Sequence, residues 1–155
     1  RLMFSPKTKI PARNLVRFDN GLLPGDMILL WRINFGTFTN ESVFPKYFSQ
    51  DYGIDAPAHL AELISKGFVE MQNVFEAIED HVPVWRLKEI LAERGEVGLS
   101  KLNRNEILDL VEVVFNEKEL EELITVRGYV LTKKGEEALQ QGQSTVDEHP
   151  KKKGY

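Results

Sequence analysis

Apolar residues recur at helical spacing along most of the chain, and short alternating stretches interrupt them. In the first half, a turn at 23–26 precedes a helical pattern that extends to residue 34, and Asp26 is a suitable N-cap. A second helix is predicted over 41–52, and a third begins at Asp55. Residues 68–71 then alternate between apolar and polar positions, which predicts a short strand.

The most regular helical pattern lies in the second half, over 83–94 and 103–115. Asn103 is a good N-cap for the second of these helices, and Glu106 completes a capping box with it. The apolar stripes of the two helices consist of Val84, Leu87, Ile90, Leu91, Ile107, Leu108, Val111, Val114 and Phe115. These stripes predict a helical hairpin.

The segments around this hairpin complete the expected organisation. Val97 and Leu99, in the extension between the two helices, are expected to pack under both of them. A short helix should follow Asn116, and a strand should occupy 127–131. Thr132 is the expected N-cap of a final helix that extends to residue 139.

This pattern predicts a mainly α protein with a few short strands. The expected segments are an extended basic arm or linker at 1–22, a helical unit with a strand at 23–78, a helix-extension-helix unit at 79–125, a strand and closing helix at 126–140, and a disordered tail at 141–155. Each half has too few residues to bury a large core alone, so we expect the halves to pack together. The nine aromatic residues between positions 31 and 75 are expected to form much of that core.

Charge adds a contrast between the ends of the chain and its middle. The 155 residues carry a net charge of −4, with five basic and one acidic residue in 1–22 but six basic and twelve acidic residues in 79–125. An acidic middle disfavours the approach of nucleic acid, whereas the basic ends are typical of solvated tails. No apolar run is long enough to span a membrane, and a cytoplasmic location is expected. The chain begins without an initiator methionine, which is compatible with a fragment or a processed product.

The sequence offers little catalytic or metal-binding chemistry. There is no cysteine, and the three histidines, His59, His81 and His149, fall in separate elements. No nucleophile-elbow, Walker-type or dinucleotide-binding motif is present. We therefore expect no enzyme activity, no cofactor, no metal and no small-molecule substrate.

Two resemblances to known families point toward nucleic acid. The order of three helices and a strand, with LAELISKGFVE at the junction, resembles a winged helix-turn-helix over residues 24–75. That resemblance assigns the recognition-helix position to residues 55–66. The side chains there are poorly suited to phosphates, so we expect this unit to serve packing or protein contact.

The second resemblance lies in the hairpin, whose phrase LKEILAERG is similar to the opening helix of the SAP motif, a DNA-binding helix–extension–helix unit. The extension here is two residues longer than in that family, and Leu110 occupies the position of a later arginine. Together, the two resemblances imply a winged-helix-like unit packed against a SAP-like hairpin. The SAP resemblance assigns the DNA-facing role to Gly98, Ser100, Lys101, Asn103, Arg104 and Asn105.

Two function hypotheses follow from these patterns. In the first, the protein is a non-enzymatic DNA-binding accessory protein that makes weak phosphate contacts through Lys101, Arg104 and the helix N-terminus behind them. In the second, it is a protein-interaction or adaptor module in which both units are structural. The acidic middle of the chain suits the second hypothesis.

Overall fold

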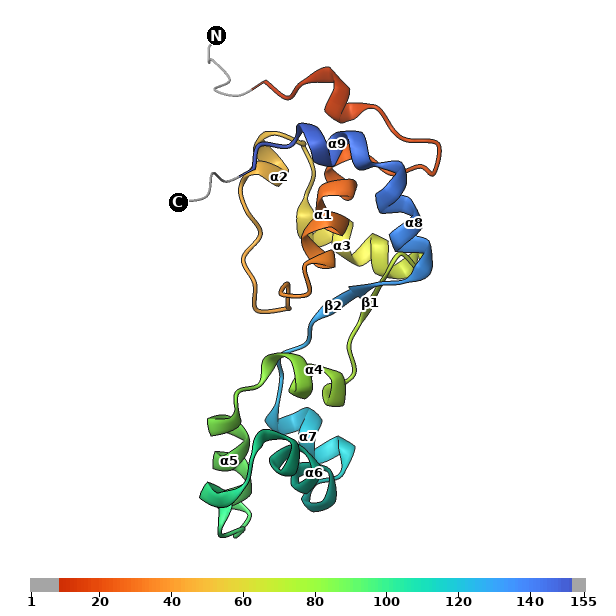
Figure 1. Ribbon diagram of the computed structural model, residues 1–155. Coiled ribbons are helices and arrows are strands. Elements are labelled where there is room, and N and C mark those ends of the chain that lie inside the picture. The colour runs from red at the N-terminus through yellow and green to blue at the C-terminus, as the bar shows by residue number, and fades with distance from the viewer. Residues whose placement is uncertain (1–8, 152–155) are drawn as a thin grey trace. The chain divides into compact units, whose positions relative to one another are not determined.

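The computed structural model describes residues 9–151 as a mainly helical chain with a small two-stranded antiparallel sheet (Figure 1). This confirms the predicted class, mainly α with a few short strands. Within the described residues the chain forms two compact units: unit 1 comprises 9–38, 42–70 and 129–151, and unit 2 comprises 39–41 and 71–128. Of the predicted arm and tail, residues 1–8 and 152–155 lie outside the described part.

Unit 1 contains the helices and strands from the N-terminal and C-terminal parts of the chain. They are the 3₁₀ helix η1 (Ala12–Leu15), helices α1 (Pro24–Asn34), α2 (Tyr47–Gln50) and α3 (Ala56–Ser65), strands β1 (Val69–Met71) and β2 (Tyr129–Leu131), and helices α8 (Lys133–Gln141) and α9 (Gln143–Glu148). Met71, the last residue of β1, already belongs to unit 2.

Helix α1 is the centre of unit 1 and contacts α3, α8, α9 and β2. Four successive residues, Met27, Ile28, Leu29 and Leu30, are fully buried, so the helix is enclosed on all sides rather than on one stripe. Its predicted start at Asp26 is wrong, because the helix begins at Pro24, whose fixed backbone angle suits the first helical position. The Asp26 carboxylate instead accepts a hydrogen bond from the Leu23 backbone N–H at 2.9 Å.

The predicted helix over 41–52 is also wrong, because only α2 is helical there. The backbone N–H of Asn40 donates to the Arg127 carbonyl, and the Arg127 N–H donates to the Asn40 side chain. Thr39 forms an isolated antiparallel bridge with Gly128. These pairings hold the chain in an extended conformation just before the segment that was expected to be helical.

Strands β1 and β2 pair although 57 residues separate Met71 from Tyr129. The Gln72 N–H donates to the Gly128 carbonyl and the Thr132 N–H to the Phe68 carbonyl, which fixes an antiparallel register. Helix α8 starts directly after β2, and Thr132 caps it as predicted. Unit 2 is therefore an insertion between two strands that are hydrogen-bonded to one another.

The two ends of the chain are more ordered than the sequence indicates. Instead of a fully extended arm, η1 buries Asn14, whose amide donates to the Asp51 carbonyl at 2.8 Å. Instead of a disordered tail, 143–148 form α9, which buries Val146 and is followed by the buried His149. Local composition predicted neither, because the apolar and aromatic partners lie far away in the sequence.

The aromatic prediction holds for most of the set. Phe38, Phe48, Tyr52 and Phe68 are buried in the core of unit 1. Phe35 does not follow the prediction, because it lies at the C-terminal end of α1 and is more than half exposed.

Unit 2 contains the helical hairpin and two helices beside it. Its elements are α4 (Val74–His81), α5 (Val84–Glu93), the 3₁₀ helix η2 (Leu99–Lys101), α6 (Arg104–Val114) and α7 (Glu117–Leu123). Capping boxes of the form Asn-x-x-Glu start α4, α6 and α7, at Asn73, Asn103 and Asn116. The apolar stripes meet in an aliphatic core, which Leu87, Ile107 and Leu120 fill with no exposed surface. The hairpin predicted over 83–115 is present as α5 and α6.

Candidate interaction surface of the helical unit

The extension between α5 and α6 holds the first residues of the predicted DNA-facing set. Gly98 has a φ of +74°, a conformation that favours glycine, and it introduces η2. The side chains of Ser100 and Lys101 are exposed and form no hydrogen bond or ion pair within residues 9–151. Leu99 packs against the core of unit 2 as expected, but Val97 does not, because it is 88% exposed.

Asn103 and Arg104 are both engaged within unit 2. The Asn103 side chain accepts from the Glu106 N–H at 2.9 Å, and the Glu106 carboxylate accepts from the Asn103 N–H. Arg104 is half-buried, and its guanidinium donates to the carbonyl oxygens of Val82, Ile78 and Glu79 at 2.9 to 3.2 Å.

The contacts of Arg104 give it a clear structural role. The last carbonyls of a helix lack partners within the helix, and Ile78 and Glu79 belong to the last turn of α4. The guanidinium supplies hydrogen bonds to that end of α4, where a positive charge is also favourable to the helix dipole. Three of its five N–H donors are occupied in this way. Of the six residues assigned by the SAP resemblance, Ser100, Lys101 and Asn105 keep exposed and uncommitted side chains.

The other arginines of unit 2 are committed to the chain itself, whereas its lysines are not. Arg86 pairs with Glu89 at 2.6 Å and also donates to the Leu123 carbonyl. Arg94 pairs with Glu119 at 2.7 Å, and its guanidinium lies 4.3 Å from the centre of the Phe115 ring. Among residues 71–128, the cations without a hydrogen bond or ion pair are Lys88, Lys101 and Lys118.

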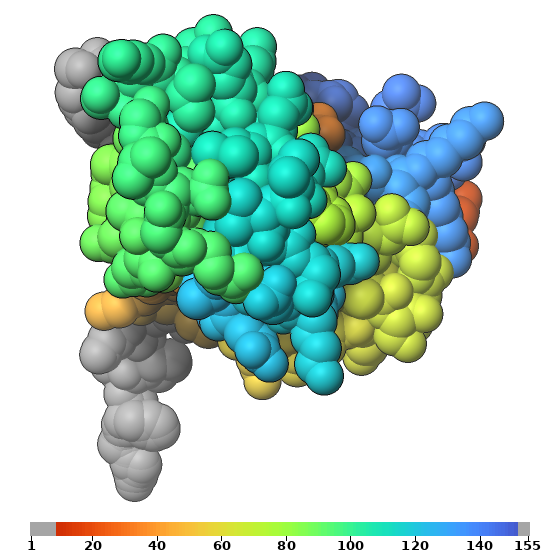
Figure 2. Space-filling model, turned by 90° about the horizontal axis from the view of Figure 1, so that it is seen from below, coloured from red at the N-terminus to blue at the C-terminus, as the bar shows by residue number. Residues whose placement is uncertain are grey.

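Acidic side chains dominate the same unit. Residues 71–128 contain thirteen Asp and Glu residues against seven Lys and Arg residues, for a net charge of −6. The α5–α7 segment, coloured green to cyan, forms a continuous surface on the face shown in Figure 2. This excess of negative charge favours the approach of cationic groups over that of phosphates.

Two histidines of unit 1 take part in polar pairs, and the pair of His149 is buried whereas that of His59 is half-buried. Nδ1 of His59 lies 2.6 Å from Oδ1 of Asp26, whose other oxygen accepts from Leu23. The Tyr52 hydroxyl lies 2.5 Å from Nδ1 of His149, and the rings of Trp31 and Tyr47 pack against the same imidazole. Burial lowers the pKa of His149 below its ordinary value, with a further decrease from Lys151. Burial also raises the pKa of Tyr52 to about 12.

These pairs lie within unit 1: Asp26 belongs to α1 and His59 to α3, whereas Tyr52 follows α2 and His149 follows α9. Within residues 9–151, no three His, Asp or Glu side chains gather closely enough to hold a metal ion. Both pairs are contacts between segments of unit 1 that are distant from one another in sequence.

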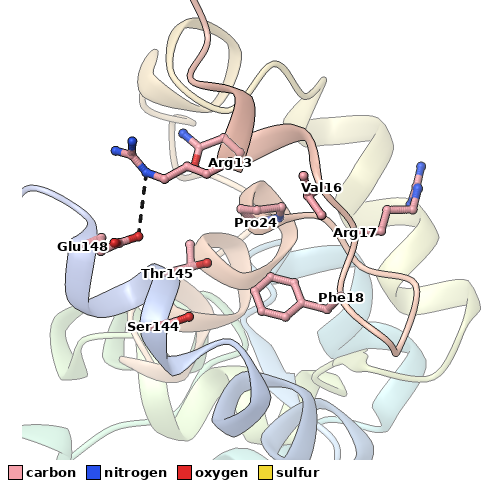
Figure 3. A pocket seen from close by; sticks show the side chains of 9 residues that line it. Arg13, Val16, Arg17, Phe18, Pro24, Ser144, Thr145 and Glu148 are labelled. Atoms are coloured by element: carbon pink, nitrogen blue, oxygen red, sulfur yellow. Dashed lines mark ion pairs between the residues drawn. The ribbon is translucent and has the colours of Figure 1, made fainter.

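A cavity of about 380 Å³ lies between α9 and the segment formed by η1 and the residues after it (Figure 3). The Arg13 guanidinium and the Glu148 carboxylate face one another at 3.7 Å, and both side chains are mostly exposed. Thr145 and the Phe18 ring form part of the wall. An exposed ion pair of this kind provides neither a desolvated acid nor an activated nucleophile.

The role of Arg104 and the existence of α4 escaped the sequence reasoning. The signal for α4 was present, because Asn73 and Glu76 have the spacing of a capping box. The cation that binds the C-terminal end of α4 is Arg104, which lies 22 residues beyond Val82 in the sequence. No short-range pattern identifies such a partner.

No family model, curated protein or solved structure matches this chain. None of the helices within residues 9–151 is long and apolar enough to cross a membrane.

Proposed function

We propose that the protein is a non-enzymatic protein-interaction module whose helical unit, residues 71–128, makes the contact. The observation that supports this proposal is that the arginines of unit 2 have internal partners, whereas most of its carboxylates have no cationic partner. Its arginines bind the chain's own carbonyls and carboxylates, whereas most of its carboxylates face solvent without a cation. Such a surface favours a cationic protein partner over a polyanion.

Unit 1 serves, in this proposal, as a winged-helix-like scaffold. The order α1, α2, α3, β1, β2 supports it, with unit 2 inserted between the two strands where the family has its wing. In the position of the recognition helix, α3, His59 is paired with Asp26 and Lys66 with Glu62. These pairings favour a packing role for α3.

DNA binding through the SAP-like extension is the second candidate. It is favoured by the exposure of Ser100, Lys101 and Asn105 close to the start of α6. With Arg104 committed to α4, one or two phosphates could be met. Counterion release then predicts a log–log salt slope of only about −1 to −2.

Titration of a labelled DNA duplex at low salt separates the two candidates. The interaction proposal expects no anisotropy change at about 50 mM salt, where phosphate contacts are strongest. Binding that weakens in Lys101→Ala but not in the matched control Lys118→Ala would overturn it in favour of DNA.

A capture experiment provides the positive test. Immobilised protein is exposed to nuclease-treated extract, beside a variant in which residues 73–127 are replaced by an Asn-Gly turn. The proposal expects a defined partner that binds the intact chain and is lost from the variant. Equal recovery by both would show that unit 2 is not the contact.

A further inference from the structure

Helices α4 and α6 leave a small apolar groove on unit 2. The N-terminal turn of α4 lies beside the C-terminal half of α6, while Arg104 at the start of α6 reaches the last turn of α4, so the two helices are antiparallel. Phe75, Ile78, Leu108 and Val111 line the groove. Ile78 and Val111 are buried in the core, while Phe75 and Leu108 are half-buried and face the opening.

The size of the groove limits what can enter it. Its volume is about 170 Å³, which is below the roughly 300 to 1,000 Å³ of typical small-molecule sites. A single large apolar side chain is of suitable size. Because the walls come from two helices of one unit, the groove needs no second copy of the chain to complete it.

Carboxylates stand on both sides of this groove. Glu79 on α4 and Glu112 on α6 line it, are exposed, and form no ion pair within residues 9–151. Glu76 also lines it, and its carboxylate accepts from the Asn73 N–H. No cation is among the lining residues, and the nearby Arg104 directs its donors toward the carbonyls of α4.

We propose that this groove binds a basic segment of a partner protein. The segment inserts one large apolar side chain between Phe75 and Leu108 and places a lysine or arginine beside Glu79 and another beside Glu112. Charge complementarity selects this occupant, because acidic rims disfavour both phosphate-bearing ligands and anionic lipid surfaces. The inference rests on the proposed interaction function and assigns a partner class to it.

The apolar floor and the acidic rim have separate consequences for binding. Burial of one apolar side chain gives most of the affinity, since exposed ion pairs contribute little each. The carboxylates determine which segment approaches and make the binding sensitive to salt. A true occupant must therefore require both its apolar residue and its cations.

The test uses the full chain and a labelled synthetic peptide with one central leucine and two lysines on each side. Two variants of the peptide replace the leucine by serine or the lysines by glutamates. At low salt we expect only the parent peptide to bind. The double variant Glu79→Gln/Glu112→Gln should bind it roughly three- to tenfold more weakly, as two exposed charge pairs predict.

The matched control is Glu93→Gln/Glu121→Gln, which makes the same charge change at exposed, unpaired carboxylates of α5 and α7. Equal weakening in both double variants would overturn the groove as the site and indicate diffuse attraction. Absence of peptide binding would overturn the proposed partner class. In either case, the interaction function would stand if partner capture still depends on unit 2. It would fail as well if no partner is captured and DNA binding depends on Lys101.

Discussion

Unit 1 and unit 2 are stabilised by different kinds of contact. The core of unit 1 combines aliphatic residues with Phe38, Phe48 and Tyr52, and it encloses polar groups such as Asp26 and His149. The core of unit 2 is almost entirely aliphatic, and each of three helices begins at its own Asn-x-x-Glu capping box. Unit 2 is also nearly continuous in sequence, whereas unit 1 is assembled from three separated segments.

The two units also differ in how far apart along the chain their stabilising contacts lie. In unit 2 the helix starts are fixed by pairs three residues apart, and the stripes meet over a short sequence distance. In unit 1 the central helix α1 is covered by α8 and α9, which follow more than 90 residues later. Such contacts require the closure of a long loop before they contribute any stability.

Truncation should produce the largest contrast between the units. Contrary to the expectation from length alone, unit 2 has an aliphatic core of its own, so a chain of residues 71–128 should show helical circular dichroism and one cooperative unfolding transition. It loses the contacts of Asn40 with Thr125 and Arg127, at a cost of about 1 kcal/mol for each hydrogen bond. Residues 9–70 should show no cooperative transition, because α1 then lacks β2, α8 and α9.

A joined form of unit 1 serves as the control for this contrast. Because Gln72 and Gly128 are paired across the sheet, an Asn-Gly turn can connect them directly. The resulting chain should regain cooperative unfolding. If residues 9–70 fold alone, or if 71–128 stay unfolded, the division between local and long-range stabilisation is wrong.

The buried Tyr52–His149 pair should make the stability of unit 1 depend on pH. The pKa of His149 is lowered in the folded state, so its contribution is complete above the ordinary histidine pKa of about 6.5 and is lost as pH falls below it. The groups that act on this imidazole are Lys151 and Arg32, which lower its pKa, and Asp51, which raises it. Urea unfolding at pH 7.5 and 5.5 measures the effect.

The variant His149→Phe should reduce this loss of stability between the two pH values. An undiminished loss would assign it to another group. At the alkaline end, the raised pKa of Tyr52 predicts that its contribution is present below pH 10 and disappears as pH rises toward about 12. Tyr52→Phe should remove that alkaline component.

A single cap in unit 2 should have the smallest effect. Asn103→Ala removes the acceptor for the Glu106 N–H and should cost about 1 kcal/mol in the free energy of unfolding. The side chain of the neighbour Asn105 is exposed and forms no hydrogen bond within the described residues, so Asn105→Ala should change stability by less than about 0.5 kcal/mol. Denaturant titration of the two variants measures the difference. Equal effects would mean that the cap does not stabilise α6.

Most of unit 2 and the start of α8 were predictable from sequence, and α4, which was not predicted, also begins at an Asn-x-x-Glu capping box. The stripe of α5, the Asn103 capping box of α6 and the Thr132 cap of α8 are all present in the structure. The candidate site was less predictable. Residue type alone suggests that Arg104 is free for phosphate, whereas its partner carbonyls belong to α4.

The sequence by itself determined the helical class, the hairpin of α5 and α6 and most helix starts, because these depend on side chains three or four residues apart. Only the tertiary structure decided that α1 is enclosed on all sides, that 143–148 form a helix, and that Arg104 caps α4. The physical reason is the distance along the chain between partners. Tyr52 and His149 meet across 97 residues, and no local pattern encodes a contact of that range.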